Sequence, residues 1–333
     1  MTSHLQNKLT YKAYLDAFKY PDDEGYLSAV ECIFAENANI NIVHPFNDMS
    51  GPNAYYERFL KPLMDAFEGL YRTDYILMAG SYESDDWVSS TGYYAGHFRN
   101  NWLGIKASDR LTYLRVGEFH KMDNGKIVQS YIYVDIPELM MASGQWPLSH
   151  GPAVKPGHTG LLMGPASHDG ILLNDADNAE SKVSLNMVTD MLRQLNTPDE
   201  AWRPYWHDNM MWYGPAAFGS FIGKENFAGF QVPFENCFSS WVGGATEGSQ
   251  TKHFIRTADG NYVCSGGWPS LNAFQVKPFL DQPSTDKLLF MRVCDWWRRD
   301  GDLLVENWVF VDIPHVLLQM GYDLFEDLKE KNE

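Results

Sequence analysis

A glutamate and a histidine, Glu118 and His120, stand two positions apart in one predicted strand. Strand side chains alternate between two faces, so residues 116, 118 and 120 point to the same side. A carboxylate on an apolar wall has a raised pKa, which suits a general base near neutral pH, and an imidazole beside it can share the proton. We therefore take Glu118 and His120 as the candidate catalytic residues. The structural alternatives for Glu118 are the rim of its sheet or an ion pair with Arg115.

Three further side chains in the first half are candidates for ligand binding. Tyr94 lies in a predicted strand and can donate a hydrogen bond to a ligand oxygen, although most strand tyrosines simply pack. His97 follows Gly96 at a strand end, where lining of a pocket mouth and a plain surface position are equally compatible with the pattern. His44 precedes Pro45 at another strand end, and its structural interpretation is favoured over ligand contact.

The sequence contains an internal repeat, which relates the candidate residues of the first half to equivalent positions in the second half. The segment Val-Asp-Ile-Pro occurs at residues 134–137 and again at 311–314, an offset of 177 that holds without a gap from residue 115 to 144. Internal repetition of this kind indicates two copies of one folded unit. The offset carries Glu118 to Asp295 and His120 to Trp297, so the second copy has an acid without a neighbouring imidazole. We expect that copy to be a binding or structural half, with Asp295 and Trp297 near the ligand.

Each copy predicts helices first and then a long series of strands. In the first copy, apolar spacing predicts helices over 8–20, 27–34 and 52–67, the last divided by Pro62, and a strand at 39–44. The later strands of the two copies are predicted at 71–80, 87–98, 111–122 and 126–135, and at 251–257, 261–268, 288–298 and 303–312. The second copy begins with helices over 180–195 and from residue 197, and a strand at 210–213. A curved antiparallel sheet wrapped on N-terminal helices gives an α+β cone, whose apolar interior is a natural small-molecule pocket.

Composition restricts the classes of partner. The 333 residues carry a net charge of −17, which opposes binding to nucleic-acid phosphates and to anionic membranes. The N-terminus is polar and no window is long and apolar enough for a membrane span. The four cysteines are far apart and form no CxxC pair, which is typical of free thiols in a reducing cytoplasm. We expect a cytoplasmic protein with a small-molecule ligand, without a cofactor, and without a metal because no ligand spacing for one is present.

Residues 146–178 differ from both copies, because they are rich in proline and glycine. They form the connector between module 1 at residues 1–145 and module 2 at residues 179–333. The outward faces of the repeated strands are aromatic, with Phe119, Tyr131, Tyr133, Trp296 and Trp308. Such patches in water promote association, so we expect the two sheets to pack face to face as a pseudo-dimer within one chain. A further homodimer through another surface stays open.

Residues 91–98, 103–105 and 123–128, together with Asp135, resemble the motifs of SnoaL-like polyketide cyclases. These proteins belong to the nuclear transport factor 2-like, or cystatin-like, superfamily. The second copy keeps part of the same pattern in Gly301, Leu304, Val305, Glu306, Trp308 and Asp312. The resemblance covers both copies but not the connector. It implies two tandem cone-shaped α+β barrels, in agreement with the order of predicted elements.

The same resemblance marks departures at the family's reactive positions. The family Asp that acts as general acid/base in an intramolecular aldol closure stands at Ile132 and Val309 here, which can only line a ligand site. The partner position on the facing strand is an acid in both copies, Glu118 and Asp295, and the family His is Tyr94. The resemblance therefore implies a cyclase- or isomerase-type protein that moves a proton on a small, largely apolar, oxygen-bearing metabolite. A non-catalytic binding protein, or cones filled by side chains, are the alternatives.

Overall fold

The computed structural model describes residues 3–19, 23–149, 163–195, 199–243 and 251–332. The chain divides into two compact units. Unit 1 consists of Met1–Trp146, Ser167–Asp175 and Asp323–Glu333, and unit 2 of Pro147–Ala166 and Ala176–Tyr322. A fragment that ended at residue 150 would therefore lack two segments of unit 1.

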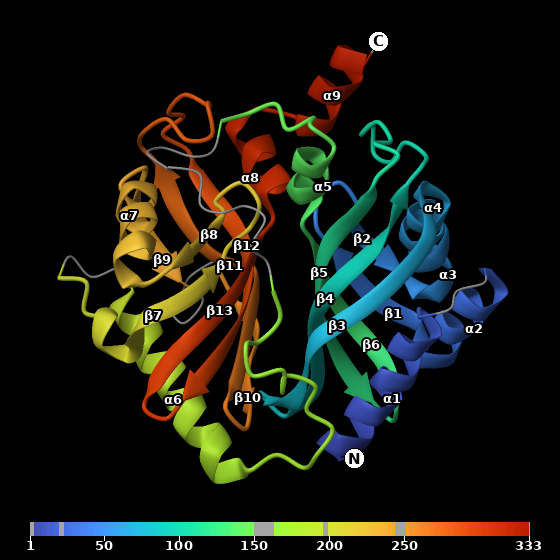
Figure 1. The fold of residues 1–333 in the computed structure, drawn as a ribbon, viewed down its shortest axis with the longest axis horizontal. Helices are drawn as coiled ribbons and strands as arrows, with labels where there is room; N and C mark the ends of the chain where they lie inside the picture. Colours follow the sequence, from blue (N-terminus) through green and yellow to red (C-terminus); the bar gives the residue numbers. More distant parts are fainter. Residues whose placement is uncertain (1–2, 20–22, 150–162, 196–198, 244–250, 333) are drawn as a thin grey trace. The chain divides into compact units, whose positions relative to one another are not determined.

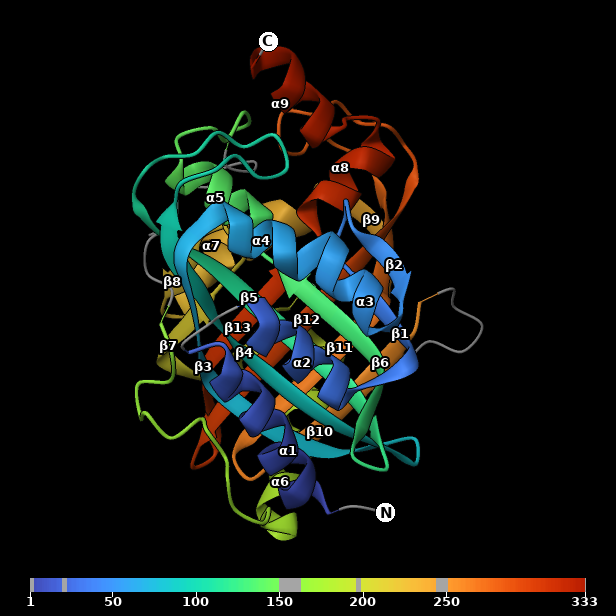
Figure 2. The same ribbon diagram turned by 90° about the vertical axis from the view of Figure 1, so that its right-hand side faces the viewer.

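Unit 1 is a six-stranded sheet with the order β2-β1-β6-β5-β4-β3. Helices α1 to α4 lie across one face of this sheet (Figure 2). The helices are α1 His4–Ala17, α2 Asp23–Ile33, α3 Gly51–Tyr55, α4 Lys61–Ala66 and α5 Ile136–Ala142. The strands are β1 Phe34–Ile42, β2 Asn47–Ser50, β3 Phe67–Tyr82, β4 Asp85–Phe98, β5 Leu111–Asp123 and β6 Lys126–Val134.

The helix expected over 52–67 is interrupted, as we predicted from Pro62, and the interruption is a π-helical segment. A π-helical segment, Tyr56–Leu60, separates α3 from α4, which begins at Lys61. Proline lacks an N–H and its ring crowds the preceding turn, so the regular hydrogen-bond ladder cannot continue through it. A proline in the first turn of α4 avoids that clash. The π-helical segment before it provides the change from the hydrogen-bond pattern of α3 to that of α4.

Unit 2 repeats this arrangement with a seven-stranded sheet. Its main path is β10-β11-β12-β13-β7-β8, and β9 pairs with β11 (Figure 1). The helices are α6 Asn178–Gln194, α7 Lys224–Glu235 and α8 Ile313–Met320, and a short 3-10 helix spans Arg203–Tyr205. The strands are β7 Trp206–Tyr213, β8 Ser220–Ile222, β9 Phe238–Gly243, β10 His253–Asp259, β11 Tyr262–Gln275, β12 Leu288–Asp300 and β13 Leu303–Val311.

The expected α+β class and the two-module architecture are confirmed, because the two sheets share one topology. Strands β3 to β6 of unit 1 correspond to β10 to β13 of unit 2, and β1 and β2 to β7 and β8. The sheets are not wholly antiparallel as expected, since β1 runs parallel to β6 and β7 parallel to β13. Parallel pairing arises because helices and a meander, rather than a hairpin, connect these strands. Strands β2 and β8 were not among the predicted strands.

Two segments that follow the first copy in sequence belong to unit 1. The C-terminal helix α9, Leu324–Asn332, brings the ring of Phe325 to 5.5 Å from that of His44. Residues 170–172 add to the edge strand β3, where the Leu77 backbone donates to Gly170 at 2.8 Å and accepts from Leu172 at 2.9 Å. The added segment satisfies backbone groups at the sheet edge. The predicted module boundaries do not assign these two later segments to unit 1.

Other expectations about organisation stay predictions. Thr197 and Pro198, where we expected a helix to begin, lie outside the described residues, as do residues 150–162 of the connector. The face-to-face packing of the sheets and the cytoplasmic location also stay predictions. Within the described ranges, no helix is long and apolar enough to cross a membrane.

Candidate functional site

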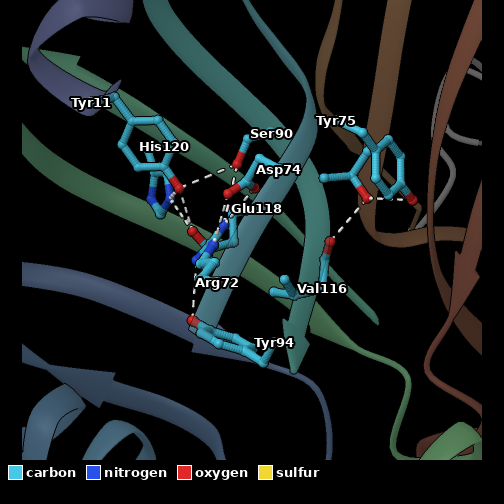
Figure 3. A network of polar contacts seen from close by, with 10 residues as sticks. Tyr11, Arg72, Asp74, Tyr75, Ser90, Tyr94, Val116, Glu118 and His120 are labelled. Atoms are coloured by element: carbon cyan, nitrogen blue, oxygen red, sulfur yellow. Dashed lines mark hydrogen bonds and ion pairs between the residues drawn. The ribbon is translucent and has the colours of Figure 1, made fainter. Parts of the chain in front are cut away.

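The inward face of the unit 1 sheet holds Glu118 in a closed hydrogen-bond network (Figure 3). Glu118 lies in the middle of β5, and its Oε1 accepts from Arg72 Nη1 at 2.7 Å. Its Oε2 accepts from the hydroxyl of Tyr11, contributed by α1, and lies 3.1 Å from His120 Nε2. All four side chains are buried. The predicted pair Glu118 and His120 is thus in contact, but protein donors already occupy both carboxylate oxygens.

Arg72 in β3 is the centre of this network. Its Nε and Nη2 donate to the two carboxylate oxygens of Asp74, and Nη2 also donates to Ser90. Its Nη1 donates to Glu118 and, at 3.1 Å, to the hydroxyl of Tyr94. A guanidinium has five N–H donors, and here each of them has an acceptor. Such full satisfaction is typical of a structural ion pair rather than of an open ligand site.

The electrostatics of Glu118 differ from the sequence expectation. Burial alone would raise its pKa, as we had expected, but the Arg72 charge and the contact with His120 outweigh burial and hold the pKa well below its usual range. We had predicted a raised pKa for Glu118 because the position of Arg72 beside it is not evident from the sequence. A carboxylate that releases its proton this readily is a weak base near neutral pH. The catalytic assignment of Glu118 and His120 therefore stays a prediction that its surroundings do not favour.

The other first-copy candidates separate into two groups. Tyr94 is buried in the Arg72 network, and Ile132 is the β6 partner of Glu118 in the strand register. His97 is exposed near the end of β4, and His44 is half-buried against Phe325. The structure therefore brings Tyr94 and Ile132 to the acid but leaves both histidines outside this cluster.

The suggested ion pair between Glu118 and Arg115 is not formed. Arg115 points to the opposite face of β5, where its Nη2 lies 3.5 Å from Asp135 Oδ2. The equivalent pair in unit 2 joins Arg292 to Asp312 at 3.0 Å. Asp312 also accepts from the His315 backbone N–H and so caps the start of α8, whereas Asp135 makes no such side-chain bond.

In unit 2 the corresponding acid is Asp295. It lies in an equivalent row of residues paired across neighbouring strands, but its neighbours differ. The cross-strand row of unit 1 is Leu77, Ser90, Glu118 and Ile132, and that of unit 2 is Arg256, Ser265, Asp295 and Val309. Serine and an aliphatic residue flank the acid in both rows. The arginine of unit 2 lies two strands from the acid, in the place of Leu77. Among the described residues, Asp295 therefore has no close arginine contact like that of Glu118 with Arg72.

A cavity of about 420 Å³ lies within unit 2, against the inward face of its sheet. Asp295, Trp297 and Val309, the three second-copy residues predicted to contact a ligand, all line it. Much of the remaining wall is aromatic, with Trp206, Trp212, Phe227, Phe230 and Phe279. This volume suits a small organic molecule, and an apolar wall with a few polar groups is the usual composition of such sites.

The carboxyl group of Asp295 has a pKa close to neutral pH, so both of its protonation states are populated there. The low-polarity surroundings raise its pKa to about 7, against the smaller lowering effects of the Asn307 amide and the Arg256 charge. Among the described residues, the hydrogen-bond partner of the carboxylate is Asn307 Nδ2, 3.4 Å from Oδ1. A group with this pKa can both accept and release a proton near neutral pH. Asp295 therefore has the property that sequence analysis expected of Glu118.

A second polar group of the cavity is a relay formed by Arg256, His253 and Ser270. Arg256 Nη2 lies 2.8 Å from His253 Nδ1, and His253 Nε2 lies 3.1 Å from Ser270 Oγ. A guanidinium only donates, so Nδ1 must accept and the ring hydrogen is on Nε2, which donates to Ser270. Burial and the Arg256 charge lower the pKa of His253 to about 3, which keeps the ring neutral. His253 thus orients Ser270 rather than exchanging protons itself.

Sequence analysis missed the residues that decide the character of each site. The ion pair of Arg72 and Asp74 was predictable from the sequence, because opposite charges two positions apart in a strand lie on the same face. His253 and Arg256 had none, because a register shift between His253 and Ile255 breaks the alternation of β10. Only the folded sheet aligns Arg256 with Asp295.

This chain is similar to several proteins of known structure. No family model matches the chain, and no curated protein matches it. Among solved structures, a candidate SnoaL-like polyketide cyclase from Jannaschia sp. is 14% identical with a TM-score of 0.37, covering 44% of this chain and 96% of its own. TsrD from Streptomyces laurentii is 16% identical with a TM-score of 0.36, covering 44% and 99%. An NTF2-like protein from Burkholderia thailandensis is 16% identical with a TM-score of 0.33, covering 43% and 98%. The expected resemblance to SnoaL-like and nuclear transport factor 2-like proteins is thus also found among solved structures.

The Arg72 network predicts a large loss of stability when its centre is removed. Arg72→Met would leave Glu118 and Asp74 buried without their shared cation, and breaking a buried pair in this way costs about 3–5 kcal/mol. Arg99→Met is the matched control in unit 1, because Arg99 pairs with Glu68 and Asp109 at the surface, where screening by water leaves an ion pair with little effect on stability. Denaturant unfolding measures both, and equal effects would contradict a structural role of the network.

The raised pKa of Asp295 predicts a stability change that depends on pH. Between the unfolded value of 3.8 and about 7, the folded protein holds a proton that the unfolded chain has lost, so wild-type stability falls as pH rises through this window. Asp295→Asn removes the effect and should stabilise by up to about 4 kcal/mol above pH 7, at ~1.4 kcal/mol per unit, with little gain near pH 4. Thermal unfolding across this range measures it. Asp208→Asn, at an exposed site of the same unit, should show no such gain.

Proposed function

We propose that the protein is a cofactor-independent enzyme of the cyclase or isomerase type, and that its reaction takes place in the unit 2 cavity. Asp295 is the proton-transfer group, and the substrate is a small, largely apolar, oxygen-bearing metabolite. The observation that carries this proposal is a cavity-lining carboxyl group with a pKa of about 7 inside an aromatic wall. Perturbed acids in apolar pockets are characteristic of catalytic sites.

The chemistry begins with removal of a proton from the carbon next to a substrate carbonyl. The Asp295 carboxylate takes this proton, and the electron pair of the broken C–H bond moves to give an enolate. Return of the proton to a different carbon completes an isomerisation. Alternatively, the enolate carbon attacks a second carbonyl of the same molecule, and Asp295 delivers the proton to the new alkoxide, which closes a ring. Both routes need one group that accepts and then returns a proton.

The surroundings of Asp295 support this role in two ways. Arg256 lies in the same cross-strand row and lines the same cavity, so its charge favours the negative oxygen of an enolate. The aromatic wall lowers the polarity around the carboxyl group, which strengthens these electrostatic effects. Val309, directly opposite Asp295 in the register, presents an aliphatic surface to the ligand.

The first-copy acid is the competing site for the same reaction. Glu118 has an imidazole beside it, which Asp295 lacks, but both of its oxygens accept from protein donors. A non-catalytic binding protein, the other alternative, needs the cavity but not the proton on Asp295. One assay can separate these three possibilities.

Proton abstraction can be measured without the natural substrate. In 5-nitrobenzisoxazole, a base removes the proton at carbon 3 while the N–O bond breaks, which gives a coloured cyanophenolate. We expect the wild-type protein to accelerate this elimination, with kcat/KM rising about tenfold per pH unit below a midpoint near 7 and level above it, because the carboxylate is the active form. Asp295→Asn should lower kcat/KM by about 10²-fold or more.

Two variants make the assignment specific. Asp208→Asn removes an exposed carboxyl group of the same unit and should leave the rate unchanged. Glu118→Gln should also keep the activity if Asp295 moves the proton, and a loss there with retention in Asp295→Asn would transfer the reaction to unit 1. Tight binding of the probe with no acceleration would instead identify a binding protein.

A further inference from the structure

The side-chain amide of Asn307, in β13, has a defined orientation in the wall of the cavity. Its Nδ2 donates to the backbone oxygen of Trp296 at 3.0 Å and lies 3.4 Å from Asp295 Oδ1. A backbone carbonyl only accepts, so the amide atom that faces Trp296 must be the nitrogen. Both hydrogens of Nδ2 therefore have acceptors within unit 2. The amide oxygen, Oδ1, is the atom that remains for a ligand.

This oxygen is accessible. Among the described residues, no donor bonds to Asn307 Oδ1, and this oxygen is not one of the fully buried polar atoms that lack a partner. Asn307 is 4% exposed, so a small part of its surface, including some of Oδ1, meets open space. Because Asn307 lines the cavity, we take that space to be the cavity. A largely buried acceptor without a donor is unfavourable, and a donor on a ligand would satisfy it.

The Asn307 oxygen lies close to the carboxyl group of Asp295. Asn307 is two positions from Val309, the register partner of Asp295, so the three side chains lie on the same face of the sheet. Oδ1 and Nδ2 of Asn307 are bonded to the same carbon, and Nδ2 is 3.4 Å from the carboxylate. Asp295 is itself only half-buried and lines the cavity. A ligand group held on Asn307 Oδ1 is therefore a neighbour of the carboxyl group.

An amide oxygen discriminates between kinds of ligand oxygen. It has lone pairs but no hydrogen, so it accepts from a hydroxyl group and repels carbonyl and ether oxygens. We propose that Asn307 is a specificity-determining residue of the unit 2 cavity, and that it selects ligands with a hydroxyl group that donates to Oδ1 beside Asp295. The rest of the ligand is largely apolar, because much of the wall is aromatic.

The inference rests on the proposed function in taking the cavity as the ligand site, but it does not require that Asp295 moves a proton. Combined with the proposed reaction, it narrows the substrate class to hydroxy carbonyl compounds. The hydroxyl group would then lie near the carbon that loses its proton, since Asn307 and Asp295 are in contact.

Three small probes test this proposal: 2-naphthalenemethanol, its methyl ether and 2-ethylnaphthalene. The first offers a hydroxyl donor, the second only an ether acceptor, and the third neither. Asn307→Leu removes the amide with little change of side-chain size. It should weaken 2-naphthalenemethanol about three- to tenfold more than 2-ethylnaphthalene, the effect of one net hydrogen bond, and should treat the methyl ether like the hydrocarbon. Equilibrium dialysis of the full-length proteins at pH 5 measures this, because Asp295 is then mainly protonated.

Asn272→Leu is the matched control, because Asn272 is a buried asparagine of unit 2 that does not line the cavity. It should change the three affinities equally. Equal weakening of the three probes by Asn307→Leu would show that the amide only supports the sheet, and would overturn the inference. A loss for the methyl ether as large as that for the alcohol would show that the amide donates to ligands, and would overturn it as well.

The results separate this inference from the proposed function. Discrimination among the probes by Asn307, combined with unchanged 5-nitrobenzisoxazole elimination in Asp295→Asn, would support the inference while the proposed function fails. Equal weakening of the probes, combined with elimination that depends on Asp295, would give the reverse result. Absence of binding of every probe to the wild type would overturn the inference, and the elimination assay would then decide the proposed function by itself.

A measurement on the wild-type protein covers the case in which Asn307→Leu does not fold. The carbonyl stretch of an asparagine side chain labelled with carbon-13 moves to lower frequency when its oxygen accepts a hydrogen bond. Infrared difference spectra of the labelled protein should show this shift when 2-naphthalenemethanol binds, but not when 2-ethylnaphthalene binds. The same spectrum with both probes would contradict the proposal.

Discussion

Each copy of the module places an acidic side chain on the inward face of its sheet, and the surroundings of that acid determine what the copy can do. A carboxylate removed from water must be compensated by a cation and hydrogen bonds, or its pKa rises. Unit 1 compensates Glu118 with Arg72, Tyr11 and His120. In the described part of unit 2, Asp295 has the Asn307 amide as its hydrogen-bond partner and a cavity beside it. The same backbone position is therefore a structural ion pair in one copy and an available proton donor or acceptor in the other.

The difference arises from a few positions around a shared scaffold. Both cross-strand rows hold a serine, an acid and an aliphatic residue in the same order, and they differ in character where Arg256 replaces Leu77. On the first helix of each copy, Tyr11 of α1 bonds to the acid of unit 1, whereas the residue at the same offset of 177 in α6 is Val188, which has no hydroxyl. His120, which contacts Glu118, is Trp297 at the equivalent position. Loss of the hydroxyl and the imidazole leaves Asp295 without the donors that satisfy Glu118.

Much of the fold was predictable because it depends on local pattern. The gap-free repeat indicated two modules, and the alternation of apolar residues predicted strands that overlap each of β3 to β6 and β10 to β13, although β11 continues to Gln275, beyond its predicted end at residue 268. The short edge strands β2 and β8 were missed, since three or four residues carry too little periodicity. The position of α9 in unit 1 was missed for another reason, because sequence order does not reveal which core a terminal helix packs against.

The sequence by itself determined that two inward acids exist, that Asp295, Trp297 and Val309 share one face, and that an aliphatic residue stands opposite each acid. Only the tertiary structure decided which acid is compensated, because Arg72 and Tyr11 reach Glu118 from a different strand and a helix. It also decided that the described cavity adjoins Asp295, and that Arg256, His253 and Ser270 form a relay across a strand with a register shift. A pKa depends on charges and burial within a few ångströms in space, and these contacts join residues up to about a hundred positions apart in the chain.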